Sequence, residues 1–500
     1  MTAGGPDQLV SGARSLDELE QRVRDDLACL CSPPANWVVP TQSDSGQPVS
    51  DVVVIGGGMC GMVASFALLN AGVRNIRIFD RSPAGREGPW VTYARMETLR
   101  SPKQLTGPAY GIASLTFRAW YVAQYGDAQW TELDKIPRPM WMDYLRWYRK
   151  VLLLPVENDV EVLKIEPEGP LLRLTLSGAG AGNDHVLARK VVMATGRDGT
   201  GRPSIPDFVG DLPKTYWRHS SETIDFESLA GKRVVVVGVG ASAVDNSAEA
   251  LESGAAEVRH LVRRKDMPTV NKLMGIGSFG FNAAFPKLDD FWRWRIMHYS
   301  FQTQTPAPRG STLRVSRHPN AYFHFDAAIA TVELVHDEVL IVTKSGKSIR
   351  TDFIILGTGF EVEPLARTEL DGYANKIALW RDRYDPPQDL RNAQLGMFPY
   401  LANDFSFTER VAGEAPWLSN IHCFNYGASA SLGKMSGDIP GISEGANWLA
   451  TEMAARFYAE DIEAHWQKLL DYDTPELRGD EWSASELPDE TTLQRMSDGG

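Results

Sequence analysis

The sequence has few cysteines and no long apolar run. Its 500 residues include four cysteines, which form neither a disulfide framework nor a spaced set of zinc ligands: Cys29, Cys31, Cys60 and Cys423. No stretch reaches the roughly 20 apolar residues that cross a bilayer, and the first residues lack the apolar core of a secretory signal. We therefore expect a cytoplasmic protein with no integral membrane association and no metal site.

The sequence also lacks an excess of basic residues. Its formal net charge is −13, which disfavours nucleic acid as the main partner but still allows local basic pockets for phosphates. Hydrophobic residues make up 43% of the chain and charged residues 23%, an ordinary balance for a protein with a large core. The length predicts two to four domains.

Glycines follow an apolar stretch near residue 51 in a pattern typical of dinucleotide binding. The stretch DVVVIGGGMCGMVASFALLNAG places Gly56, Gly58 and Gly61 between a Val/Ile-rich strand and a helix. The first glycine allows a tight turn, the second admits a pyrophosphate, and the third lets the helix pack closely on the strand. Asp80 closes the next strand, where a carboxylate can bind the ribose hydroxyls. The alternative is a strand–helix turn that binds no ligand.

The same pattern returns in HSSETIDFESLAGKRVVVVGVGASAVD, with Gly238, Gly240 and Ala243 in the three positions. Its second strand ends in Arg263, Arg264 and Lys265 instead of an acid. Guanidinium groups pair with a 2′-phosphate that a carboxylate would repel, so this site should prefer NADP to NAD. A solvated basic turn is the alternative. An acid at one site and a basic cluster at the other predict two cofactors, FAD in the first and NADPH in the second.

The order of these units predicts an α/β protein with two dinucleotide-binding Rossmann-like domains, the NADP domain inserted into the FAD domain. Short strands before residues 190–196, and again over 332–360, each lead to a strand ending in A/G-T-G, and the second nucleotide unit lies between them. The expected divisions are an N-terminal helical extension at 1–50, the first part of the FAD domain at 51–205, the NADP domain at 206–330, the second part of the FAD domain at 331–470, and an acidic tail at 471–500. A helix over 15–30 should begin at Ser15 as its N-cap.

Reduced flavin can pass its electrons to a disulfide or to oxygen. A disulfide reductase needs paired cysteines at the flavin, and Cys60 has no near partner in the sequence. Cys29 and Cys31 fall in the predicted N-terminal helix. The cysteines therefore favour chemistry with O2.

Residues 51–450 resemble the class B flavoprotein monooxygenases. The resemblance is carried by the segment 219–245 quoted above, by MATG and LGTGF at two strand ends, and by GDIPGISEGAN. Where the family has Phe and Gly before the histidine, this chain has Pro213 and Thr215, and Thr223 replaces a later aromatic residue, which weakens the Baeyer–Villiger subtype most. By this match, further cofactor-binding residues are Arg81, Trp90, Thr195, Gly196, His219, Ser242, Asp438 and Gly441.

Within that family, METLRSPKQLTGPAYGIASLTFRAWY is similar to a stretch of the microbial N-hydroxylases. The match puts Lys103 on the family's substrate-binding lysine, and FGFNAAFPKLDD would make Asn282 its substrate asparagine, with Asn320 a weaker candidate. The pattern departs at Glu97, where the family has Gln, and at Ala283, where it has an acid. Arg100 or Lys103 could stabilise a peroxide anion.

The resemblance implies a single-component monooxygenase in which NADPH reduces FAD and O2 then forms a C4a-(hydro)peroxyflavin. N-hydroxylation of a primary amine is the first expectation for the small-molecule substrate. S- or N-oxygenation and Baeyer–Villiger oxidation use the same intermediate and stay open. From other classes, an NADPH:acceptor reductase or oxidase and a cofactor-binding protein without turnover also remain. Relatives of this family are often dimers or tetramers, so a homo-oligomer is a further expectation.

Overall fold

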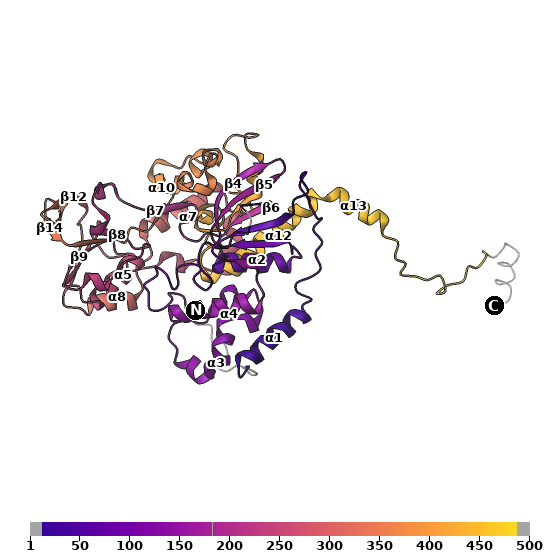
Figure 1. Cartoon of the computed structure of the whole chain (residues 1–500), viewed down its shortest axis with the longest axis horizontal. Helices are drawn as coiled ribbons and strands as arrows, with labels where there is room; N and C mark the ends of the chain where they lie inside the picture. Colours follow the sequence, from indigo (N-terminus) through magenta and orange to yellow (C-terminus); the bar gives the residue numbers. More distant parts are fainter. Residues whose placement is uncertain (1–12, 183, 488–500) are drawn as a thin grey trace, which may run out of the picture. The chain divides into compact units, whose positions relative to one another are not determined.

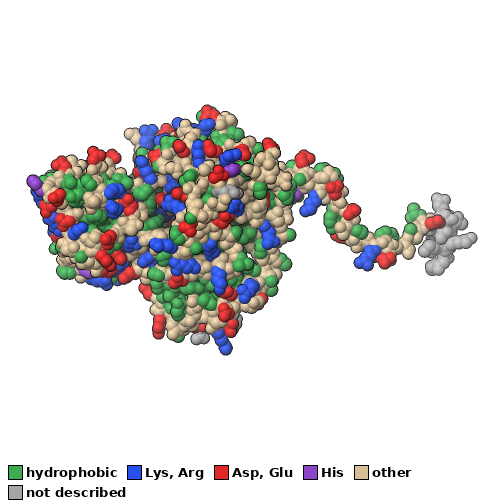
Figure 2. Space-filling model, in the orientation of Figure 1, with side chains coloured by type: hydrophobic (Ala, Val, Ile, Leu, Met, Phe, Trp, Pro, Cys, Tyr) green, Lys and Arg blue, Asp and Glu red, His purple; other side chains and the backbone are tan. Residues whose placement is uncertain are grey.

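The structure is a computed structural model that describes residues 13–182 and 184–487. Contacts between Cα atoms divide the chain after Ala455 into two units, and each is described by itself. Among the described residues, no helix combines the length and apolar character that a bilayer crossing requires. On the face shown in Figure 2, basic and acidic side chains are intermixed.

The first sheet is built around the strand that precedes the first glycine turn. Strand β1 (Val49–Ile55) is buried along its whole length and pairs in parallel with β2 (Ile76–Phe79) and β6 (His185–Met193). A parallel strand covered on both faces needs a continuous run of branched apolar residues, which positions 52–55 supply. The strand order is β3-β2-β1-β6-β5-β4, and β17 also pairs with β6. The remaining strands are β3 (Val156–Glu157), β4 (Glu161–Glu168), β5 (Leu171–Ser177) and β17 (Ile421–Cys423).

Helix α2 (Met59–Asn70) connects β1 to β2 and is almost entirely buried, as its apolar sequence predicts. The predicted N-terminal helix is α1 (Leu16–Cys29), and the predicted cap is confirmed because the Ser15 side chain accepts a hydrogen bond from the Glu18 N–H. The β1-α2-β2 order is the strand–turn–helix–strand unit that the glycine pattern requires.

Two aromatic-rich helices pack together beside α1. Helices α3 (Phe117–Glu132) and α4 (Arg138–Val151) share a buried cluster in which the Phe117 and Tyr144 rings lie 5.5 Å apart and the Trp141 and Tyr144 rings 5.0 Å apart. Helix α1 contacts α3, and Figure 1 shows α1, α3 and α4 near one another. The aromatic residues of the 117–148 region are therefore core, except for the exposed Tyr125.

The second sheet contains the second glycine turn. Its order is β11-β10-β9-β15-β8, with all pairs parallel. Helix α5 (Ala241–Glu252) connects β9 to β10, and α8 (Arg309–Ser316) packs against it (Figure 1). The strands are β8 (Trp217–His219), β9 (Arg233–Val237), β10 (Glu257–Leu261), β11 (Ala321–His324) and β15 (Phe353–Leu356). The chain thus repeats the strand–turn–helix arrangement, and the α/β class is confirmed.

The boundary expected at residue 330 is not where the second sheet ends. Strand β15 pairs with β9 and β8, so this sheet continues to Leu356. The antiparallel strands β12 (Ile329–Val335), β13 (Glu338–Thr343) and β14 (Ser348–Thr351) pack on the same sheet through Ile341. The earlier β4-β5 meander instead joins the first sheet through β6. Two meanders that look alike in sequence therefore join different sheets.

A short two-stranded ribbon links the two sheets. Strands β7 (Gly201–Pro203) and β16 (Phe360–Val362) are antiparallel, with Gly201 opposite Val362. A Cβ at Gly201 would lie 1.9 Å from the Glu361 carbonyl oxygen, so the two backbones approach as closely as glycine allows. The other helices are α6 (Phe279–Ala284), α7 (Asp290–Thr303), α9 (Trp380–Arg383), α10 (Ala393–Gly396), α11 (Ser429–Leu432), α12 (Ile442–Glu460) and α13 (Ile462–Asp471).

Candidate functional site

The first glycine turn has the shape that a pyrophosphate requires. Gly56 has φ +104°, and a Cβ there would lie 2.5 Å from the Ala194 carbonyl oxygen. A Cβ at Gly61 would lie 1.8 Å from the Gly56 carbonyl oxygen, so this glycine lets α2 pack on the turn. Gly58 is the N-cap of α2, and a Cβ there would meet nothing nearer than 3.8 Å. Gly58 therefore leaves open space in front of the helix N-terminus, where phosphate groups are favoured.

Asp80 is fixed at the end of β2. One carboxylate oxygen accepts a hydrogen bond from the Gly57 N–H at 2.8 Å and the other from the Ser82 N–H at 2.7 Å. Arg81 next to it is exposed and lies 3.8 Å from Glu161. Asp80 is buried but still borders the cavity described below, so its remaining acceptor positions can face a ribose.

The second glycine turn repeats this geometry. Gly238 has φ +105°, and a Cβ at Gly240, the N-cap of α5, would meet no atom within 4 Å. A Cβ at Gly357 would lie 2.3 Å from the Ala243 Cβ. Ala243, the third residue of the glycine pattern, therefore packs against the backbone just after β15. The Ser242 hydroxyl donates to the Ser220 hydroxyl at 2.9 Å. This turn also leaves open space at a helix N-terminus.

The basic strand end lies beside the second turn. Arg263 is exposed, and Arg264 donates a hydrogen bond to the Gln302 carbonyl oxygen at 2.8 Å. Burial lowers the pKa of Arg264, and the neighbouring Arg263 charge lowers it further. Two adjacent guanidinium groups that repel one another would both gain from a shared phosphate.

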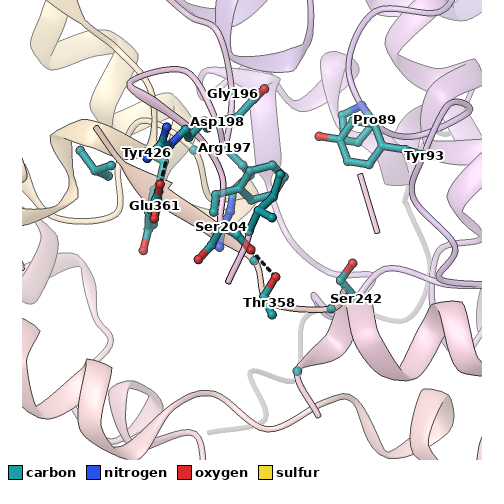
Figure 3. A pocket seen from close by; sticks show the side chains of 18 of the residues that line it. Pro89, Tyr93, Gly196, Arg197, Asp198, Ser204, Ser242, Thr358, Glu361 and Tyr426 are labelled. Atoms are coloured by element: carbon teal, nitrogen blue, oxygen red, sulfur yellow. Dashed lines mark hydrogen bonds and ion pairs between the residues drawn. The ribbon is translucent and has the colours of Figure 1, made fainter. Parts of the chain in front are cut away.

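Both turns open into one cavity of about 1800 Å³. This is larger than the roughly 300–1,000 Å³ of a typical small-molecule site, as two dinucleotides would require. Figure 3 shows side chains from several loops around it: Pro89 and Tyr93 after β2, Arg197 after β6, and Ser242 and Thr358 beside the second turn. The residues from the sequence analysis that line it are Gly56, Gly58, Asp80, Arg81, Trp90, Arg100, Thr195, Gly196, Gly238, Gly240, Ser242, Arg263 and Arg264.

His219 is buried and does not line the cavity. Its Nε2 lies 2.9 Å from the Gly359 carbonyl oxygen, to which it must donate, and its Nδ1 accepts from the Ser221 N–H at 3.2 Å. Burial lowers the pKa of His219, although the Gly359 bond opposes this, so the ring is neutral at neutral pH. His219 ties β8 to the loop between β15 and β16.

Lys103 lies outside the main cavity. Its ammonium group donates to the Trp130 carbonyl oxygen at 2.5 Å and to the Thr131 carbonyl oxygen at 3.2 Å, and lies 5.0 Å from the Trp130 ring centre. It borders a separate small hollow with Pro102 and residues 131–135. Lys103 is therefore held against α3 and away from the two glycine turns.

Asn282 also lies outside the cavity lining, as do Asp438 and Gly441. The Asn282 amide nitrogen is 3.6 Å from where a Gly441 Cβ would be, so these two positions lie together. Arg100 does line the cavity and donates to the Pro306 carbonyl oxygen. Burial lowers the pKa of Arg100, while the charges of Asp245 and Asp438 raise it. Of the three predicted catalytic residues, only Arg100 borders the space between the cofactor turns.

The four cysteines are free, and the one at the cavity is unreactive. Cys60 lines the cavity, and burial, aided by the charge of Asp438, raises its pKa to about 12. The nucleophile in thiol chemistry is the thiolate, which Cys60 does not form at neutral pH. Cys423 is buried, and Cys29 and Cys31 are exposed. The geometry thus agrees with the sequence argument against disulfide chemistry.

Several polar residues that line the cavity were not identified from the sequence, among them Arg197, Lys434 and Asp245. Arg197 follows Thr195 and Gly196 directly and stacks on Tyr426, its guanidinium carbon 4.5 Å from the ring centre (Figure 3). Lys434 comes three residues before the quoted GDIPG stretch. Asp245, on α5, is buried with its Oδ1 lacking a hydrogen-bond partner among the described residues, and burial raises its pKa. For Arg197, the adjacent A-T-G strand end was a usable signal.

Comparison with known proteins decides the family. The model of the pyridine nucleotide-disulphide oxidoreductase family matches residues 53–273, which include both glycine turns. A FAD-dependent urate hydroxylase of Xanthomonas campestris pv. campestris is 39% identical over 468 residues, which cover 93% of this chain and 98% of that protein. This chain belongs to the FAD-dependent hydroxylase family. The hydroxylase is thus an oxidoreductase, as its sequence predicted.

Solved structures share the fold of this hydroxylase. The reduced form of an ornithine hydroxylase from Pseudomonas aeruginosa has a TM-score of 0.63 at 16% identity, covering 81% of this chain and 99% of that chain. An L-lysine 6-monooxygenase from Pseudomonas syringae has a TM-score of 0.62 at 18% identity, with 82% and 99% covered. The predicted resemblance of the hydroxylase to class B flavin monooxygenases is confirmed.

Proposed function

We propose that the hydroxylase binds FAD at the first glycine turn and NADPH at the second. The residues present fit both groups: Gly58 and Gly240 leave the helix N-termini of α2 and α5 open, where any side chain would intrude. Asp80 suits the FAD ribose, and Arg263 and Arg264 suit a 2′-phosphate. On this proposal the first sheet forms the FAD domain, and the second sheet with β12–β14 forms the inserted NADP domain.

When bound, FAD takes two electrons from NADPH and activates O2, so that one oxygen atom enters the substrate and the other leaves as water. The chain's own residues position the two cofactors around one cavity. Arg100 presents a positive charge to that space. No protein nucleophile is needed for this reaction, in keeping with the protonated Cys60 thiol.

The substrate we propose is urate or a closely related oxidised purine. One observation supports this above others: the 39% identity with a urate hydroxylase extends over 98% of that protein. The amine hydroxylases share the fold at 16–18% identity. N-hydroxylation of a primary amine remains the second candidate because Lys103 and Asn282 match that branch in sequence, but both lie outside the cavity lining.

The test is turnover with matched substrates. Purified FAD-loaded protein is given NADPH and, in parallel, urate, ornithine, lysine or no substrate, while NADPH oxidation, O2 uptake and H2O2 release are followed. We expect urate alone to accelerate NADPH oxidation and to be consumed in proportion to it, with little H2O2. Acceleration by an amine with hydroxylamine formation would establish the second candidate. Equal NADPH oxidation in all samples, with all the O2 recovered as H2O2, would establish an oxidase instead.

Replacing Arg263 with serine should raise the KM for NADPH by about 10- to 100-fold, because a charge-assisted bond to the 2′-phosphate is lost. The KM for NADH should change little, since NADH has no such phosphate. Lys265→Ser is the matched control, because Lys265 is in the same basic run but does not line the cavity. An equal effect of both substitutions on NADPH would contradict a specific phosphate contact.

A further inference from the structure

Lys434 is a cavity residue without a partner among the described residues. It follows the one-turn helix α11 and a glycine, Gly433, with φ +78°. Its side chain lines the cavity and is only partly exposed. Within residues 13–182 and 184–487, its ammonium group has no hydrogen bond and no ion pair. Partial burial weakens the hydration of an unpaired ammonium group, so an anionic ligand in the cavity is a natural partner.

The backbone at Lys434 is held firmly. A Cβ at Gly445 would lie 2.2 Å from the Met435 carbonyl oxygen, and one at Gly441 would lie 3.4 Å from the Lys434 carbonyl oxygen. The Ser436 hydroxyl donates to the Asn425 carbonyl oxygen at 2.7 Å. The loop therefore packs directly on the first turns of α12 and presents Lys434 from a fixed position. Such positioning reduces the entropy lost when a ligand binds.

The surroundings of Lys434 are positively charged. Burial lowers its pKa; the charge of Asp438 opposes this shift, and the charges of Arg197 and Arg100 add to it. Arg197 also borders the cavity, and its guanidinium group stacks on Tyr426 without an ion pair to any described residue. Three cations therefore face one carboxylate, and the excess positive charge points to an anion.

We propose that Lys434, together with Arg197, binds the negative charge of a planar anionic heterocycle and so selects the substrate. The inference rests on the proposed function and deepens it: urate loses a proton below neutral pH and is planar, whereas the side chain of ornithine or lysine carries an ammonium group. The ammonium group of Lys434 would attract the urate anion and repel the ammonium group of ornithine or lysine. Lys434 is thus a specificity residue, and it binds the substrate that Lys103 cannot reach.

The test measures binding without turnover. Oxidised, FAD-loaded protein is titrated with urate in the absence of NADPH, and the change in flavin absorbance gives a Kd. We expect Lys434→Met to raise this Kd by about 10- to 100-fold and Lys434→Arg to preserve most of the affinity. Arg197→Met should raise the Kd as well. Lys347→Met, an exposed lysine in the β13–β14 turn, is the matched control and should leave it unchanged.

The pH dependence gives a second readout. A lysine is charged below its pKa, and the pKa of Lys434 is lowered, so urate binding should weaken as pH rises through that value. In Lys434→Arg the charge persists, and the Kd should stay level over the same pH range. Asp438, Arg197 and Arg100 are the charged groups that face Lys434 and are unchanged in this comparison.

The outcomes separate the two proposals. If the wild-type protein binds urate and loses affinity in Lys434→Met but does not oxidise it, the inference stands and the proposed function fails. An unchanged Kd in Lys434→Met, with turnover intact, overturns the inference and leaves the function. Loss of FAD, or a raised KM for NADPH at constant urate affinity, also overturns it, because Lys434 would then pair with a cofactor phosphate.

Discussion

Alanine at Gly61 should leave the protein almost without FAD. The added Cβ would lie 1.8 Å from the Gly56 carbonyl oxygen, which is a backbone atom in a turn of φ +104° and cannot move aside as a flexible side chain would. The strand–helix turn must therefore open, and overpacking of this kind costs about 1–3 kcal/mol. We expect the flavin retained per polypeptide after desalting to fall by about ten-fold or more, with a lower Tm.

Gly310→Ala is the matched control for this substitution. Gly310 lies in the first turn of α8, and a Cβ there meets no atom within 4 Å. Alanine favours a helix over glycine by about 1 kcal/mol, so this variant should keep its flavin and be equally or slightly more stable. Wild-type flavin content in Gly61→Ala would show that the turn is not the FAD cradle.

Replacing Arg314 with methionine should destabilise the protein by about 3 kcal/mol. Its buried guanidinium lies 2.5 Å from Glu252 on α5 and 3.4 Å from Glu97, and donates to the Arg95 carbonyl oxygen at 3.1 Å. Breaking a buried pair costs about 3–5 kcal/mol, and the lower end applies here because Glu252 is partly exposed and keeps Arg317. Equilibrium unfolding in urea, followed by circular dichroism, measures the change.

Arg350→Met provides the comparison for Arg314→Met. Arg350 forms an exposed pair with Glu338 at 3.2 Å, and exposed pairs contribute about 0–1 kcal/mol. Because Glu97 and Arg95 belong to the loop after β2 while Arg314 and Glu252 belong to the second sheet's helices, Arg314→Met should also weaken the contact between the two sheets. Equal unfolding midpoints for both variants would show that the buried cluster contributes no more than an exposed pair.

The sequence predicted the two nucleotide turns because their requirements are local. A positive φ at Gly56 and a close approach at Gly61 exclude side chains at those positions, and the buried strand before them is a continuous apolar run that can be recognised in the sequence. The acidic residue Asp80 and the basic residue Arg263 each follow their glycine turn at the sequence spacing that the strand–helix–strand unit requires. Residues that are required by the conformation of the neighbouring backbone can be identified from a single sequence.

The residues that would contact the substrate could not be predicted in this way. Lys103 and Asn282 matched a pattern, yet neither lines the cavity: Lys103 donates a hydrogen bond to the Trp130 carbonyl oxygen, and Asn282 lies on α6. The local sequence does not record which side chains reach the cavity. Lys434 lines the cavity on a loop that packs against the start of α12, and no recognisable motif marks this lysine in the sequence. The sheet to which a strand such as β15 belongs is hard to predict for a similar reason, because its partners β8 and β9 lie far from it in the sequence.

The ribbon of β7 and β16 brings together the two ends of the segment 201–362, which contains the second sheet. Residues opposite one another on paired strands lie about 5 Å apart, so the chain enters this segment at Gly201 and leaves it at Val362 at nearly the same point in space. Everything between forms one continuous segment whose ends already meet. An exchange of this segment between relatives at these two positions would keep the path of the host chain, but it would also have to preserve the core that Trp294 and Met297 of α7 share with Trp380 and Phe398.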